Sequence, residues 1–153
     1  MAKIVTALDI GRPLETVWNY LTDLHNSKDW STEVVDTEYR GPIRLGATGV
    51  DTRRWGKREV KMNWEVTEFE PPRLMTLKYG PPLNAVADFA FQPTAAGGTR
   101  VSCTTTLKPS GWMRLLAPFI AAEGRKADQK QFAKAKEILE REGSRNQEPD
   151  PDK

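Results

Sequence analysis

The sequence predicts an α+β fold in which a curved antiparallel sheet of about six to seven strands wraps round a long C-terminal helix. Three observations support this fold class. An alternating segment near the start leads into two short helical segments. About six more alternating segments then follow one another with only turn residues between them, and the chain ends in one long helical pattern. Strands joined by such short turns pair antiparallel, because a parallel pair needs a long crossover.

The first strand and two short helices account for residues 3–33. One face of the strand is better buried than the other, and it carries Ile4, Thr6, Leu8 and Ile10. Pro13 suits the first turn of a helix that ends near Asp23, because proline lacks the N–H that a helix start leaves unbonded. Residues 25–33 read as a short helix or turn that carries Trp30.

Six alternating segments follow and form the rest of the sheet. They span residues 34–40, 46–55, 58–69, 74–79, 85–91 and 99–107. Gly56 and Lys57 predict a tight turn between the second and third of these segments, because glycine accepts a positive φ angle. Prolines after Glu70 and Gly80 end strands, since proline cannot donate to a central ladder.

The last helical pattern spans about residues 112–142, with Pro118 starting or kinking the main helix after a separate turn at 110–117. Its buried stripe is bulky at both ends and small or polar in the middle. The stripe comprises Leu116, Ile120, Gly124, Ala127, Gln131 and Ile138, flanked by Phe132, Ala135 and Leu139. A helix that only sealed a core would keep large residues throughout. The middle therefore leaves volume for neighbouring side chains or for a ligand.

The chain has the size of one domain. With 153 residues and 38% hydrophobic content, it can bury one sizeable core. We expect a single domain over residues 1–142, with Gly143 ending the last helix. Residues 143–153 contain no apolar side chain and two prolines, which predicts a disordered tail.

Charge and cysteine content restrict the partners and the compartment. The formal net charge is +2 with acidic and basic residues mixed, so nucleic acid is not an expected partner. The single cysteine excludes an intrachain disulfide. The start has no signal-peptide pattern and no segment reaches membrane-spanning length, so we expect a cytoplasmic protein without integral membrane contact. The sequence leaves monomer and homodimer open.

Catalytic signals are few. His25 lies among polar neighbours and is expected at the surface, and Cys103 lies mid-strand as a buried, inert thiol. One histidine and one cysteine far apart cannot form a zinc site, so no metal is expected. The sequence has no phosphate-binding loop, nucleophile elbow or dinucleotide glycine pattern, and we expect no cofactor. Whether the protein is an enzyme stays open, with a non-catalytic binding protein preferred.

A basic hairpin spans residues 53–61 and contains Arg53, Arg54, Lys57, Arg58 and Lys61. It fits a solvated rim that protects a sheet edge, which we favour, or a contact for an anionic group. The two neighbouring arginines point to opposite faces of their strand. One of them therefore faces inward, where it needs a partner such as a ligand acid or Asp51.

Several motifs in order resemble one family. They are Arg12 to Trp18 (RPLETVW) with Asp23 and Trp30 after it, Val66 to Arg73 (VTEFEPPR), Gly97 to Val101 (GGTRV), and the long terminal helix. In this order and spacing the chain resembles the START-like (SRPBCC, Bet v 1-like) helix-grip proteins, within them the bacterial polyketide cyclase/dehydrase and lipid-transport branch. The resemblance covers residues 3 to about 142. It implies a hydrophobic cavity between the curved sheet and the terminal helix, open near one helix end.

The predicted inward faces supply candidate ligand-binding residues. They are Met62, Trp64, Met75, Leu77, Tyr79, Phe89, Phe91, Cys103 and Thr105 from the sheet, with Gly124, Ala127 and Gln131 from the helix. By alternation alone these residues fit a solid core as well as a cavity lining, and the resemblance favours the cavity. An apolar lining with few polar groups suits a lipid, an aromatic or a polyketide-like molecule.

Two functions remain open, together with a weaker third. The preferred one is non-catalytic binding or transport of a small hydrophobic ligand. The alternative is a polyketide cyclase or dehydratase, which by resemblance would polarise its substrate with Tyr79, Trp64, Gln131 and an inward arginine. The third is a partner-binding module whose cavity is filled.

Overall fold

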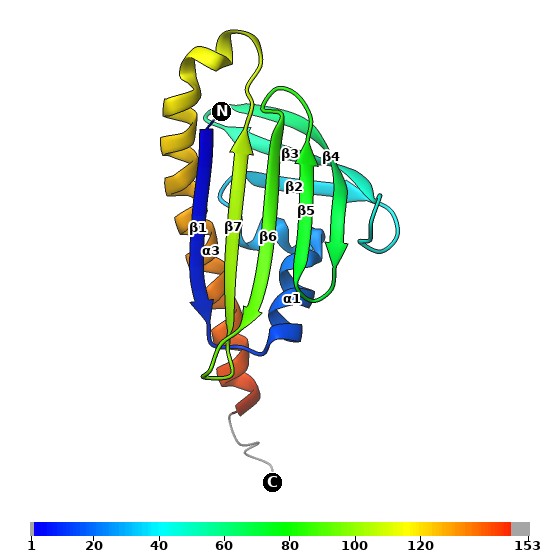
Figure 1. Ribbon diagram of the computed structural model, residues 1–153, viewed down its shortest axis with the longest axis vertical. Helices are drawn as coiled ribbons and strands as arrows, with labels where there is room; N and C mark the ends of the chain where they lie inside the picture. Colours follow the sequence, from blue (N-terminus) through cyan, green and yellow to red (C-terminus); the bar gives the residue numbers. More distant parts are fainter. Residues whose placement is uncertain (1, 148–153) are drawn as a thin grey trace.

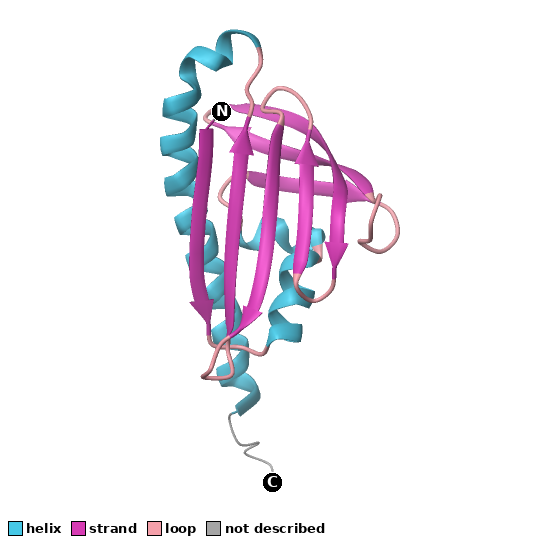
Figure 2. Ribbon diagram, in the orientation of Figure 1, coloured by secondary structure: helices cyan, strands magenta, loops and turns pink. Residues whose placement is uncertain are grey.

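The computed structural model describes residues 2–147, which form one antiparallel sheet and a set of helices (Figures 1 and 2). The strands are β1 (Ala2–Ile10), β2 (Val34–Tyr39), β3 (Thr48–Trp55), β4 (Arg58–Glu70), β5 (Leu74–Tyr79), β6 (Ala85–Pro93) and β7 (Thr99–Leu107). The helices are α1 (Leu14–Thr22), α2 (Ser27–Trp30) and α3 (Ala117–Gln147), with 3₁₀ turns η1 (Leu24–Asn26) and η2 (Gly111–Leu116). The predicted fold class is confirmed.

The seven strands pair in the order β1-β7-β6-β5-β4-β3-β2, all antiparallel. Gly56 has a φ of +64° in the turn between β3 and β4, as the sequence predicted. Register shifts between Val34 and Asp36 and between Val66 and Glu68 increase the local twist. The sheet therefore curves, and β2 and β3 cross behind the strands in front (Figure 1).

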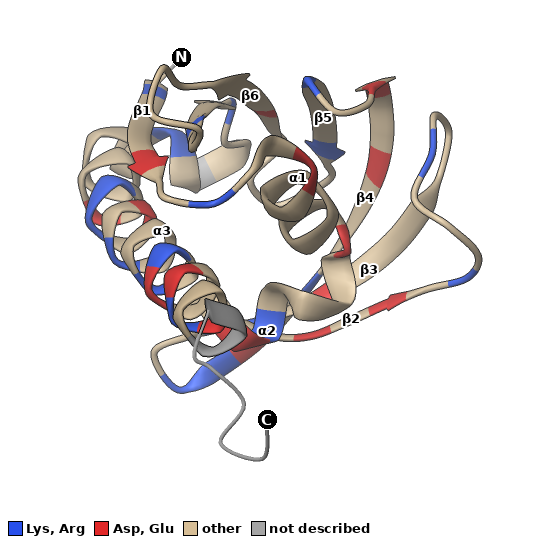
Figure 3. Cartoon of the chain, turned by 90° about the horizontal axis from the view of Figure 1, so that it is seen from below, with Lys and Arg blue, Asp and Glu red and all other residues tan. Residues whose placement is uncertain are grey.

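The helices cover the concave side of the sheet. Seen from below, α3 runs along the open side of the curved sheet, between β1 and α2. Helix α1 lies inside the curve of the sheet, at the end of the molecule nearest the viewer (Figure 3). Contacts of α3 with β1 and α2, and of α1 with β6, hold this arrangement. Pro118 is the second residue of α3 and η2 precedes it, so the predicted separate turn is confirmed.

The C-terminal half of α3 is held more firmly than its start. Arg12 donates from Nη1 to the carbonyl of Leu139 at 2.8 Å, and Lys136 donates from Nζ to the carbonyl of Asp9 at 2.7 Å. The buried side chains of this half are Phe132, Ala135 and Leu139. At the other end, Phe119 is 72% exposed. The end of β1 and the loop after it thus fix one half of the helix.

The predicted end of the last helix at Gly143 was wrong, because α3 continues to Gln147. Glycine at this position serves a close approach instead. A Cβ atom on Gly143 would lie 2.7 Å from Cδ of Arg12, so the arginine crosses the helix where a side chain is missing. Residues 143–147 are helical, and the rest of the predicted disordered tail, residues 148–153, lies outside the described residues.

The interior contains two apolar clusters. The larger one surrounds Trp18, Val66 and Phe91 at the end of the sheet covered by α1. The smaller one joins β1, β6, β7 and the start of α3 through Ile4, Ala85, Leu107 and Ala121. Residues of both clusters line the space described next.

Candidate functional site

A cavity of about 560 Å³ lies between the concave face of the sheet and α3. Its lining combines the larger cluster, through residues such as Leu77 and Phe132, with the smaller one, through Ile4 and Leu107. This volume is within the range of small-molecule sites. Exposed lining residues at the β3–β4 turn and the start of α3, including Gly56 and Phe119, mark its opening to solvent.

Nine of the predicted site residues line this cavity: Met62, Leu77, Tyr79, Phe89, Cys103, Thr105, Gly124, Ala127 and Gln131. Strand alternation placed their side chains on the concave face, and the cavity includes both small residues of the α3 stripe. Ile4 reduces the space beside one of them, because a Cβ atom on Gly124 would lie 2.6 Å from its Cδ1 atom. The thin middle of the stripe thus serves close packing with β1 as well as the cavity.

Three other predicted residues, Trp64, Met75 and Phe91, lie in the packed core and do not line the cavity. Trp18 of α1 packs its ring edge-on to Phe91 with 4.9 Å between ring centroids. Trp64 covers Gly49, where a Cβ atom would lie 2.3 Å from Cζ2 of the indole. A side chain on the concave face of the sheet therefore does not always line the cavity. Packing of α1, and the contact of Trp64 with Gly49 of β3, fill these parts of the face.

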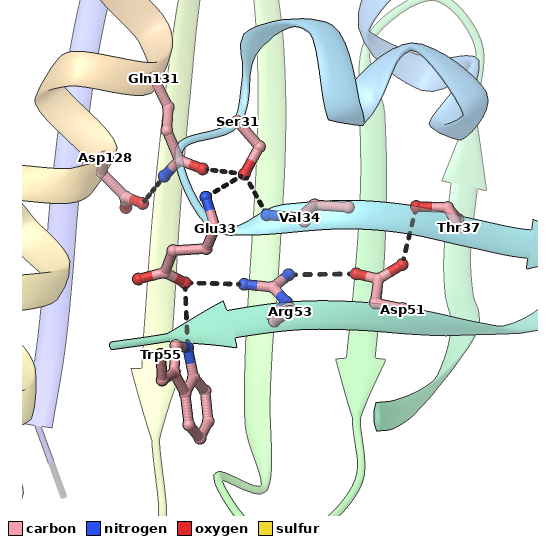
Figure 4. A network of polar contacts seen from close by, with 9 residues as sticks. All are labelled: Ser31, Glu33, Val34, Thr37, Asp51, Arg53, Trp55, Asp128 and Gln131. Atoms are coloured by element: carbon pink, nitrogen blue, oxygen red, sulfur yellow. Dashed lines mark hydrogen bonds and ion pairs between the residues drawn. The ribbon is translucent and has the colours of Figure 1, made fainter. Parts of the chain in front are cut away.

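An ion-pair network lies along one wall of the cavity (Figure 4). Arg53 of β3 faces inward and contacts Asp51 at 3.2 Å and Glu33 at 3.3 Å. Asp51 is 5% exposed and also accepts a hydrogen bond from Thr37 at 3.1 Å. The indole Nε1 of Trp55 donates to Glu33 at 3.5 Å. The predicted inward arginine is thus confirmed, with Asp51 as one of its partners.

A second polar group connects α3 to the start of β2. Ser31 donates from Oγ to Oε1 of Gln131 at 2.5 Å, and Gln131 donates from Nε2 to Oδ1 of Asp128 at 3.2 Å. Oγ of Ser31 also accepts from the backbone N–H groups of Glu33 and Val34. Gln131 is therefore already bonded on both sides of its amide. The sequence interpretation missed Ser31, Glu33 and Asp128, although Asp128 lies three residues before Gln131 and so shares its helix face.

Burial changes the acidity of the cavity's titratable groups. It raises the pKa of Asp128 to about 6, with a further increase from the negative charge of Glu33. Burial also raises the pKa of the Cys103 thiol to about 12 and the pKa of Tyr79 above its ordinary value. At neutral pH the thiol and the phenol are protonated, which agrees with an inert Cys103.

The remaining sequence candidates lie outside the inner wall. His25 is exposed and stacks on Tyr39, with 4.0 Å between ring centroids. Arg54 points away from Arg53 and pairs with Glu59 at 3.2 Å, with both side chains largely exposed. Most of the basic hairpin is thus solvated, as favoured from the sequence, but it does not protect a sheet edge, because β3 and β4 are both interior strands.

Residues 2–147 show neither a metal-binding cluster nor a helix that could span a membrane. The described histidine, cysteine and acidic side chains form no group of three that could hold a metal ion. No helix in the same part of the chain is long and apolar enough to cross a membrane.

The curved sheet, the long α3 and the internal cavity define a helix-grip protein. Comparison with family models identifies which one: the chain belongs to the polyketide cyclase/dehydrase and lipid transport family, whose model matches residues 1–140. The family predicted from the sequence motifs is confirmed. No curated protein matches the chain significantly in sequence.

Solved structures share this fold at low sequence identity. TTHA0849 from Thermus thermophilus has a TM-score of 0.77 and 17% identity, with 90% of this chain and 97% of that chain covered. The ZhuI aromatase/cyclase from Streptomyces sp. R1128 has a TM-score of 0.77 and 11% identity, covering 92% and 94%. Ara h 8.0201 has a TM-score of 0.71 and 9% identity, covering 90% and 97%. At these identities the likeness concerns the fold alone.

Proposed function

We propose that the protein binds or transports a small hydrophobic molecule, such as a lipid, an aromatic or a polyketide-like compound, in the cavity under α3. The observation that carries this proposal is the cavity of about 560 Å³ that extends over Gly124 and Ala127. A filled core at this place would have favoured a partner-binding module instead. Membership of a family described by polyketide cyclisation and lipid transport agrees with such a ligand.

Burial of apolar surface supplies the affinity in this proposal. Each 100 Å² of apolar ligand surface removed from water contributes roughly 2.5 kcal/mol, before the cost of immobilising the ligand. Half-buried side chains such as Phe89 and Ile120 provide the apolar contact. The nine cavity-lining residues predicted from the sequence are our candidates for ligand contact.

Filling the cavity tests this proposal. Ala127→Trp places an indole in the lining, and the matched control Ala122→Trp places the same group on an exposed position of α3. We expect the first variant to lose binding of the neutral fluorescent probe N-phenyl-1-naphthylamine and the second to keep it. Circular dichroism checks that both variants fold. Equal binding by Ala127→Trp and the unmodified protein would contradict the placement of the site.

An enzymatic role as a cyclase or dehydratase is the second candidate. It is favoured by Asp128, whose pKa of about 6 lets its carboxyl exchange a proton near neutral pH. The guanidinium of Arg53, 5.0 Å from the ring centre of Tyr79, supplies a positive charge that could polarise a carbonyl. In this case Tyr79→Phe or Gln131→Leu lowers kcat on a polyketide substrate more than it raises KM. Equal losses in binding and turnover would argue against a chemical role.

A further inference from the structure

The polar wall of the cavity carries more negative than positive charge. On this inner wall the carboxylates of Glu33, Asp51 and Asp128 face the guanidinium of Arg53, while the other charged lining residues, Arg54 and Glu123, lie at the opening. Arg53 is already shared between two of these carboxylates. Its positive charge is therefore compensated within the protein, and the third carboxylate on α3 adds to the excess of negative charge.

The carboxylates of Glu33 and Asp128 each have one oxygen that accepts no hydrogen bond from the described residues. Among the described residues, hydrogen bonds reach Glu33 at Oε2 and Asp128 at Oδ1. The side chains approach the same space from opposite sides, one from the start of β2 and one from α3 (Figure 4). Burial is the main cause of the raised pKa of Asp128, and the negative charge of Glu33 raises it further. A group that donates hydrogen bonds between them would relieve the repulsion of the two carboxylates.

A buried donor in the same lining also has no partner. The indole of Trp30 is 8% exposed, and its Nε1 atom has no hydrogen-bond partner among the described residues. Buried polar groups in folded proteins are nearly always bonded to protein, water or ligand. The nitrogen itself has almost no accessible surface, so a ligand in the cavity would reach it only if the indole ring turned.

Charges at the opening do not reverse the polarity of the inner wall. Arg54 pairs with Glu59 at 3.2 Å, and Glu123 lies 3.9 Å from Lys126. These four side chains are largely exposed, so solvent and salt screen them. The inner groups are more buried and are screened less.

We infer that the ligand's polar end is an amine or a hydroxyl group, held between Glu33 and Asp128, and not a carboxylate or a phosphate. This inference rests on the proposed function, because it concerns the molecule bound in the same cavity. An anionic head group would face two carboxylates while the nearby arginine is already paired. The formal net charge of +2 for the whole chain favours anions, so a preference for a cation must come from the local wall.

Three probes with the same alkyl chain separate the possibilities: decylamine, decanol and decanoate, each used to displace N-phenyl-1-naphthylamine from the full chain near neutral pH. We expect decylamine to bind about tenfold or more tightly than decanoate, with decanol between them. Decanoate binding as tightly as decylamine would overturn the inference and leave the proposed function intact. Failure of all three to displace a bound probe would also overturn the inference alone, whereas failure of the probe itself to bind the unmodified protein would overturn both.

Charge-neutralising variants assign the preference to its residues. In Asp128→Asn and in Glu33→Gln, the ratio of decylamine to decanoate affinity should fall several-fold, while the decanol affinity changes by less than about twofold. The matched control is Glu137→Gln, which removes one exposed carboxylate from the same helix and should leave the ratio unchanged. An equal change of the ratio in the control would show that net charge, and not the cavity wall, sets the preference.

Discussion

The guanidinium of Arg53 lies 5.0 Å from the centre of the Tyr79 ring. The two residues belong to β3 and β5, which are separated by β4, so this contact crosses the concave face of the sheet. An arginine held over an aromatic ring and between two carboxylates has little freedom to move. Arg53 is therefore a fixed structural element of the cavity wall. We expect its removal to lower the free energy of unfolding more than it lowers ligand affinity.

Replacing Arg53 with Met should lower the free energy of unfolding by about 3 kcal/mol, because Asp51 would stay buried without its cationic partner. Urea denaturation followed by circular dichroism measures this change. Arg54→Met is the control, since its pair with Glu59 is exposed and should contribute less than about 0.5 kcal/mol. Similar losses in the two variants would contradict a structural role for the inward arginine.

Asp128 should make the protein less stable as the pH rises from about 4 to 6. Its pKa in the folded state, about 6, exceeds its ordinary value of 3.8, so the folded state binds this proton more tightly. The carboxylate consequently opposes folding fully above about pH 6, and this opposition disappears as the pH falls toward 4.

Asp128→Asn tests that dependence. Allowing for the partial exposure of the group, we expect a gain of about 1 to 2 kcal/mol in the free energy of unfolding near pH 7.5. Near pH 4 the variant and the unmodified protein should be equally stable, because the acid is then neutral in both states. Asp36→Asn, an exposed carboxylate on β2, serves as the control. A gain that does not vary with pH would refute the assignment to Asp128.

Gly124 and Ile4 should be energetically coupled. Alanine normally stabilises a helix over glycine by up to about 1 kcal/mol, but here its Cβ atom would meet Cδ1 of Ile4 at 2.6 Å. Ile4→Val removes that terminal methyl group. In a double-mutant cycle measured by thermal or urea unfolding, Gly124→Ala should be more favourable by about 0.5 kcal/mol or more in the Ile4→Val background. Additive effects would mean that the two residues do not limit each other.

Cys103 should react slowly with thiol reagents while the protein is folded. The thiol is buried and its pKa is raised to about 12, so little thiolate is present near pH 8. We expect labelling by a disulfide reagent to be at least about 100-fold slower in the native protein than in urea. Because the chain has one cysteine, the signal is unambiguous. Comparable rates in both conditions would contradict this burial.

Strand periodicity was sufficient to predict which face of the sheet is buried, because alternation fixes the side of the sheet for residues in regular register. It does not fix the position along the strand at which a packed core gives way to a cavity. Met75 and Phe91 face inward as predicted, yet they lie in the core cluster that includes Trp18 of α1. That boundary depends on where α1 lies against β6, which is a contact between distant parts of the chain.

The polar wall was predictable only in part for the same reason. The inward arginine followed from two adjacent arginines on one strand, and Asp51 is its neighbour two residues away. Glu33 and Asp128 are 95 positions apart in the printed sequence and come near each other only because α3 packs across the open sheet. Likewise, Gly143 suggested a helix end, but its role depends on Arg12 at the opposite end of the chain.

The unequal attachment of α3 has a consequence for ligand choice. Arg12 and Lys136 fix its C-terminal half to the end of β1 and the loop after it, whereas its start carries exposed apolar side chains such as Phe119 beside the opening. The polar wall reaches α3 near its middle, where Gln131 is bonded to Ser31. Under the proposed function, such a site would select for the polar group of its ligand and accept apolar tails of different lengths.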